Sequence, residues 1–177
     1  MNTIRILPLL LAALVALPSA PVSAQSTRER GIGPYNLVTS RGEAPVRLLR
    51  RDRDILWVDR HVRTGEFIET GVPVSEIIEF KSPRPPVFDQ AEAATTPEQI
   101  GAAIDQIRKF TALLRPYRDL PGIPVNDALL LQAKLNERRE LWREALLVYQ
   151  DLLAQPYDFP GKSQIRFQAG LCLWRME

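Results

Sequence analysis

The stretch NDALLLQAKL (126–135), followed by LWREALLVYQDLL (141–153), decides the fold of this chain. Apolar residues recur in both stretches at steps of three and four, which is the period of a helix that buries one face. The polar residues NERRE (136–140) interrupt the pattern between them. We therefore expect two antiparallel helices joined by a short turn.

Small and bulky residues recur along both predicted helices. Ala145 stands three residues after Trp142 and four before Tyr149, and Ala133 stands four after Leu129. This arrangement resembles the tetratricopeptide repeat, a helical hairpin in which a small residue lets two helices approach closely and a large one fills the space beside it. The resemblance implies that these five residues pack the two helices together.

The resemblance is to tetratricopeptide-like hairpins of exported bacterial proteins, and it covers at most residues 88–177. Ala169 and Gly170 match the small site of a following first helix. Gln132 and Asn136 depart from the large apolar or aromatic residues that the repeat has there, and Glu140 replaces a Gly before the second helix. An ordinary antiparallel bundle would show similar apolar stripes and stays open as the alternative.

The last predicted helix, over residues 163–174, carries apolar residues that nothing later in the sequence covers. Phe167, Leu171, Leu173 and Trp174 supply this surface, and few charged residues stand nearby. A large exposed apolar patch is unusual on a soluble monomer. We therefore expect these four residues to bind a partner, or the chain to be a fragment of a longer array whose further repeats cover them.

Residues 35–80 have a different pattern, in which short apolar runs alternate with polar turns. The expected strands cover residues 37–38, 46–49, 55–58, 67–68 and 77–80. Strands at such close intervals predict a small antiparallel sheet or barrel. Because so short a segment has little core of its own, we expect this β domain to pack against the helices.

The linker KSPRPPV (81–87) is rich in Pro and should be extended and semi-rigid. Thr96 and Gln99 then have the spacing of a capping box, with Pro97 at the first helical position, and the helix that they begin ends before Pro116. The chain should therefore have an α+β fold, with the β domain followed by an α-helical domain over residues 88–177.

The N-terminus has the features of an export signal. Arg5 precedes an apolar run, and Val22-Ser23-Ala24 supplies the small residues that a signal peptidase requires. We predict a signal peptide over residues 1–24 and a flexible lead-in over 25–34. An uncleaved anchor is the alternative. The mature protein should be periplasmic or secreted, with no membrane span after signal removal.

Catalytic, metal and cofactor motifs are not recognisable in the sequence, so we expect no enzyme and no cofactor. His61 is the only His, which leaves a metal ion without further ligands, and we expect it in a solvated turn. Cys172 is the only Cys and stands among apolar residues, so a buried thiol is favoured over a reactive one. The formal net charge of +2 gives no general attraction to nucleic acid.

One concentration of basic residues precedes the third expected strand. It comprises Arg41, Arg47, Arg50, Arg51 and Arg53. Such a group can form a face for an acidic partner, or it can be a solvated strand edge on which charges discourage pairing with other sheets. The acidic residues that alternate with these arginines favour the solvated edge.

Two classes of function remain. The first is a non-enzymatic protein–protein interaction scaffold of the cell envelope, whose partners are envelope proteins or further repeats of the same chain. The second is an accessory or ligand-recognition subunit of an envelope enzyme or transport system, in which the β domain recognises the ligand. The helical resemblance favours the first.

Overall fold

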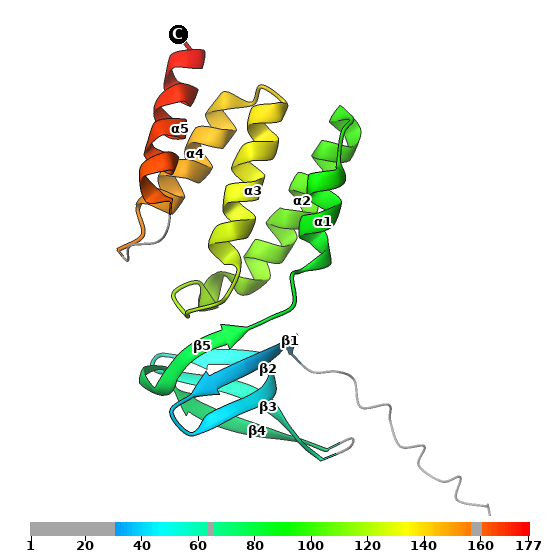
Figure 1. The fold of residues 1–177 in the computed structure, drawn as a ribbon, viewed down its shortest axis with the longest axis vertical. Coiled ribbons are helices and arrows are strands. Elements are labelled where there is room, and N and C mark those ends of the chain that lie inside the picture. The colour runs from blue at the N-terminus through cyan, green and yellow to red at the C-terminus, as the bar shows by residue number, and fades with distance from the viewer. Residues whose placement is uncertain (1–30, 64–65, 157–160) are drawn as a thin grey trace, which may run out of the picture.

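The computed structural model describes residues 31–63, 66–156 and 161–177. The predicted signal peptide and most of the predicted lead-in lie outside the described residues. Five strands come first along the chain and five α-helices follow (Figure 1), so the predicted α+β fold is confirmed.

The strands form one antiparallel sheet in the order β4-β3-β2-β1-β5. Their bounds are β1 Ile32–Thr39, β2 Gly42–Asp52, β3 Ile55–Arg63, β4 Glu66–Pro73 and β5 Ile77–Lys81. A single turn of 3₁₀ helix, η1 (Val74–Glu76), joins the two edge strands. In a flat sheet these edges would lie about 19 Å apart, whereas the chain from Pro73 to Ile77 reaches at most about 14 Å. The sheet therefore curls strongly, as in a small barrel.

Several strands extend further than the sequence indicates. β1 begins at Ile32, so the last part of the predicted lead-in belongs to the sheet. The expected polar turn over residues 50–54 is largely strand, because Arg50 pairs with Trp57 and Arg51 with Leu56. β3 likewise includes His61, which was expected in a turn. Charged residues occupy these positions because one face of each strand is exposed, and pairing of the backbone does not require apolar side chains there.

The helices follow after a short proline-rich segment. Their bounds are α1 Pro86–Ala93, α2 Pro97–Leu114, α3 Val125–Arg138, α4 Trp142–Leu153 and α5 Lys162–Arg175. The predicted capping box of α2 is confirmed, with the Gln99 amide N–H donating to the Thr96 hydroxyl at 3.3 Å and the Thr96 N–H donating to the Gln99 side chain at 3.2 Å. Each helix packs mainly against the helices next to it in the chain, so α5 lies at one end of the layer (Figure 1).

The curled sheet and the helices share one apolar core. The sheet contributes Tyr35, Leu37, Val46, Leu48, Leu56, Val58 and Phe80, and the segment from the end of α2 to the start of α3 contributes Leu114, Tyr117, Leu120, Ile123 and Val125. All of these side chains are buried. The expectation that the small sheet packs against the helices is therefore confirmed, and neither part completes this core alone.

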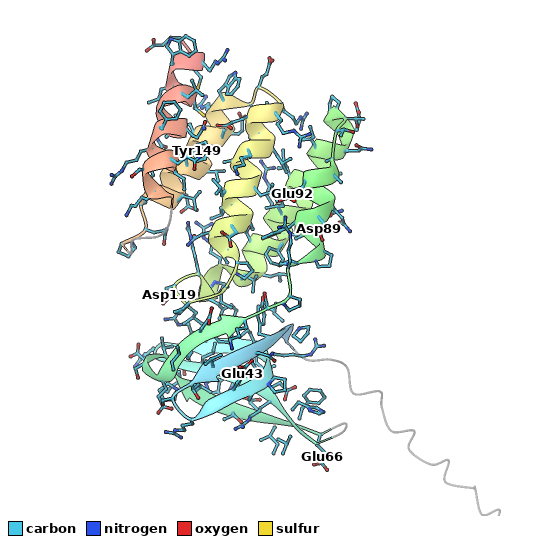
Figure 2. All side chains as sticks on the ribbon, in the orientation of Figure 1. Glu43, Glu66, Asp89, Glu92, Asp119 and Tyr149 are labelled. Atoms are coloured by element: carbon cyan, nitrogen blue, oxygen red, sulfur yellow. The ribbon has the colours of Figure 1, made fainter. Side chains whose placement is uncertain are left out.

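Polar contacts reinforce the same junction. Arg51 on β2 forms a bidentate ion pair with Asp119. Its Nη1 donates to Asp119 Oδ1, and its Nη2 donates to Asp119 Oδ2 at 2.9 Å. Asp119 lies on the side of the helical layer that faces the sheet (Figure 2). The hydrogen bond from Arg51 is the main reason why the pKa of the Asp119 carboxyl is lowered. The Phe80 N–H on β5 also donates to the Pro121 carbonyl at 2.8 Å.

Candidate interaction surface

The residues predicted to pack the hairpins come together where α3, α4 and α5 meet. Ala133, Ala145, Tyr149 and Ala169 are all buried in one cluster. Ala145 is 0% exposed, so its methyl group is fully enclosed by its neighbours. Figure 2 shows Tyr149 between α4 and α5. Leu129 and Trp142 are half-buried and pack against the edge of this cluster.

Gly170 does not lie in that cluster, so its predicted packing role is wrong. It is exposed, and a Cβ built on it would have no atom within 4 Å. The buried side of α5 instead carries Ile165, Ala169 and Cys172, which recur at steps of four and three. Gly170 follows Ala169 directly, and one residue turns a helix by about 100°, so the two neighbours face different sides.

The polar residues that depart from the repeat pattern on α3 are nevertheless buried. Gln132 and Asn136 both have little exposure, and neither amide atom of Asn136 has a hydrogen-bond partner among the described residues. The Asn136 carbonyl accepts the Leu141 N–H at 2.9 Å, which closes the turn between α3 and α4. Glu140 in that turn has a φ of 58°, which is the left-handed conformation in which Gly is usual. The turn therefore has the backbone conformation expected of a Gly at this position, although Glu140 stands there.

Three polar side chains meet beside the same cluster. The Tyr149 hydroxyl donates to the Glu137 carboxylate at 3.0 Å, and the Cys172 thiol lies 3.7 Å from the same oxygen. Burial and the nearby carboxylate raise the pKa of Cys172 to about 11, and the same two causes raise the pKa of Tyr149 above its ordinary value. Both groups are therefore neutral at physiological pH.

We expect Cys172 to be an unreactive thiol in the folded protein. Because the thiolate is the nucleophile, a raised pKa and full burial should slow alkylation by iodoacetamide at pH 8 at least about tenfold relative to the protein in denaturant. Mass spectrometry over a time course measures this directly. Equal rates in the two conditions would show that the thiol is accessible.

The opposite side of α5 presents apolar residues to solvent. Phe167 is 68% exposed, Trp174 is 63% exposed and Leu173 is 52% exposed, whereas Leu171 is half-buried. Phe167, Gly170 and Trp174 follow one another at steps of three and four, so they form one stripe along the helix. Three of the four predicted partner-binding residues are thus exposed, and Leu171 lies at the margin of the stripe.

Arg175 stands beside this stripe and links it to α4. Its guanidinium lies 5.2 Å from the centre of the Trp174 ring and 5.6 Å from that of Trp142. Cation–π contacts at such distances stabilise exposed aromatic rings by about 0.5–1 kcal/mol each. The Trp174 ring is therefore held in place although most of it is exposed.

The basic residues of the sheet are largely engaged with carboxylates. Arg41 lies 3.0 Å from Glu76, Arg50 lies 2.6 Å from Glu69, and Arg51 pairs with Asp119. This pairing supports a solvated, charge-balanced surface over a face for polyanions. The expected edge position is wrong, because β2, which carries Arg47, Arg50 and Arg51, is the middle strand of the sheet. His61 is exposed on β3 and contacts the Phe67 ring edge-on, with 5.2 Å between ring centres.

A groove that the sequence does not indicate lies between β5, α1 and α3. It has a volume of about 630 Å³. Lys81, Arg84, Glu92, Asp127 and Lys134 give its rim mixed charge, and Phe88 lies among its lining residues. The indication of this groove in the sequence was the pair of basic residues in the proline-rich linker, Lys81 and Arg84. Their position opposite α3 depends on tertiary packing, which the sequence pattern does not show.

Within the described ranges, no three His, Cys, Asp or Glu side chains gather closely enough to hold a metal ion. None of the described helices combines the length and the apolar composition of a transmembrane span.

Comparisons with protein-family models, with curated proteins and with solved structures give no match for this chain.

Proposed function

We propose that this chain is a non-enzymatic interaction scaffold of the bacterial cell envelope. In this proposal the helices act as tetratricopeptide-like hairpins, and the protein reaches the periplasm or the exterior through the signal over residues 1–24. The single observation that carries the proposal is the stripe of Phe167, Gly170 and Trp174 on the exposed side of α5. Trp and Arg residues such as Trp174 and Arg175 are enriched among the residues that contribute most to binding at protein interfaces.

The packing of the helices gives further support. Each helix contacts its neighbours along the chain, and the contacts of α5 with its helical neighbours are mainly with α4. In stacked hairpins the last helix exposes the side that another helix would cover. The core shared with the sheet holds the connection between α2 and α3, whereas α5 lies away from it at one end of the helical layer.

A photo-crosslinking amino acid at position 167 tests the proposal in living cells of the native host. Ala102 on α2 is also exposed and serves as the matched control position. We expect crosslinked protein adducts from position 167 and few from position 102. Absence of any protein adduct from position 167, with the variant exported and folded, would contradict the scaffold.

The groove between β5, α1 and α3 favours the second function, an accessory subunit that recognises a ligand. Its volume of about 630 Å³ lies within the range of small-molecule sites. Its mixed charge, from Lys81, Arg84, Lys134, Glu92 and Asp127, would suit a zwitterionic ligand. Calorimetric titration with envelope metabolites of that charge type distinguishes this function from the scaffold.

A further inference from the structure

Helix α5 is apolar on two opposite sides. Ile165, Ala169 and Cys172 are buried on one side, whereas Phe167 and Trp174 project from the other. A helix with a single apolar side suits the surface of a protein, and one with apolar residues on both sides suits a position between two neighbours. Among the described residues α4 covers only the first side. The second side therefore has the composition of an interface between helices.

Gly170 gives this second side a notch between two aromatic rings. It follows Phe167 by three residues and precedes Trp174 by four, and nothing lies within 4 Å of the Cβ that it lacks. No contact among the described residues requires this glycine, although Gly inside a helix is less stable than Ala. Since the distance between packed helices depends on the side chains at the contact, the notch allows a second helix to approach closely.

The charged residues within α5 have one sign. Between positions 162 and 175 the helix contains Lys162, Arg166 and Arg175 and no Asp or Glu. Arg166 lies on one flank of the stripe, on the same side of the helix as Leu173 two turns further on. Arg175 lies on the other flank, against the Trp174 ring. A complementary surface therefore needs carboxylates on both flanks of an apolar centre.

Antiparallel pairing of α5 with α5 of a second copy does not satisfy that need. If two α5 helices paired antiparallel about Gly170, Arg166 of one copy would lie near Trp174 and Arg175 of the other. Like charges would then face one another, and none of the opposing residues within α5 is acidic. Repulsion between these arginines disfavours such an arrangement, and attraction to carboxylates favours an acidic partner.

We infer that the outer side of α5 binds an amphipathic helix of a partner protein that carries acidic residues on both flanks of its apolar stripe. The partner's apolar side chains pack around Phe167 and Trp174, and its backbone approaches at Gly170. Its carboxylates pair with Arg166 and Arg175. This inference rests on the proposed scaffold function and specifies the chemistry of its partner.

The test uses full-length protein in the native host, with the photo-crosslinking residue at position 167 and the crosslinked segment identified by mass spectrometry. We expect a segment with apolar residues at helical spacing and Asp or Glu on both sides of them. Two pairs of variants are compared. Gly170→Ala should retain the crosslink, whereas Gly170→Leu should fill the notch and reduce its yield at least about tenfold.

The second pair of variants tests the charges. One double variant carries Arg166→Glu and Arg175→Glu, and its control carries Arg166→Lys and Arg175→Lys. The reversed pair should reduce the yield at least about tenfold, and the lysine pair should retain most of it. Thermal melting of each purified variant verifies folding, and Gly170→Leu should fold because the position is exposed.

The outcomes separate the two claims. A captured segment from a second copy of this chain, or one that is basic or extended, would overturn the acidic helix while leaving the scaffold in place. Yields that do not change in Gly170→Leu and in the charge-reversed variant would overturn it as well. If no protein segment is captured from position 167 in the unmodified background, the scaffold itself is overturned.

Discussion

Ala145→Leu is expected to lower the free energy of unfolding by about 1–3 kcal/mol, because the larger side chain has no space to occupy. Ala145 is 0% exposed and lies in the cluster that joins α3, α4 and α5. The added atoms would push α4 away from its neighbours or force side chains out of their preferred rotamers. Thermal melting of the mature chain should show a lower midpoint, by roughly 3–10 °C for a protein of this size.

Two controls separate overpacking from other effects of the substitution. Ala145→Ser adds one oxygen atom and should be milder than Leu. Ala102→Leu makes the same chemical change at an exposed position of α2 and should alter the midpoint little. If Ala145→Leu melts at the same temperature as Ala145→Ser, the small residue does not mediate close packing and the hairpin register is wrong.

The periodic parts of the chain were predictable because their pattern repeats over many residues. Ala133, Ala145, Tyr149 and Ala169 are buried together as the spacing of small and large residues predicts. The N-cap of α2 was also predictable, because the capping box is a local interaction between Thr96 and Gln99. These features depend on residues that are close in sequence, so the sequence alone contains the necessary information.

Gly170 shows where the same reasoning fails. Its neighbour Ala169 is equally suited to a small site, and residue type alone does not determine which of the two faces α4. The structure buries Ala169 and exposes Gly170. The step from Ile165 to Ala169 to Cys172 contained the answer, since all three belong to one helical side. Because the outer side of α5 also carries apolar residues, this spacing did not stand out in the sequence.

The packing of the sheet against the helices was predicted, but the particular residues that make the contacts were not, for a different reason. Arg51 and Asp119 are 68 residues apart in sequence, and each looks like an ordinary surface charge. Their pairing depends on the curl of the sheet and on the position of the loop before α3. The groove beside β5 has the same origin, because its lining comes from segments that only tertiary folding brings together.

Gly122→Ala is expected to weaken this junction strongly. Gly122 has a φ of +83°, and a Cβ at this position would lie 1.9 Å from the Phe80 carbonyl oxygen. The left-handed conformation costs a residue with a side chain roughly 1–2 kcal/mol, and the clash with the backbone of β5 adds to that cost. We expect the free energy of unfolding to fall by at least about 2 kcal/mol relative to the unmodified protein.

Gly161→Ala is the matched control. Gly161 has a similar φ of +88°, but among the described residues nothing lies within 4 Å of a Cβ placed there. Its substitution therefore measures the conformational cost without a clash against any described residue, and the difference between the two variants measures the contact with Phe80. The readouts are the thermal midpoint and hydrogen exchange of the Phe80 amide, which donates to the Pro121 carbonyl. Only Gly122→Ala should accelerate that exchange by local opening, since the loop must move away from β5 to admit a methyl group. Equal destabilisation in both variants, with unchanged exchange at Phe80, would mean that the loop does not press against the sheet and that the junction depends on the apolar core alone.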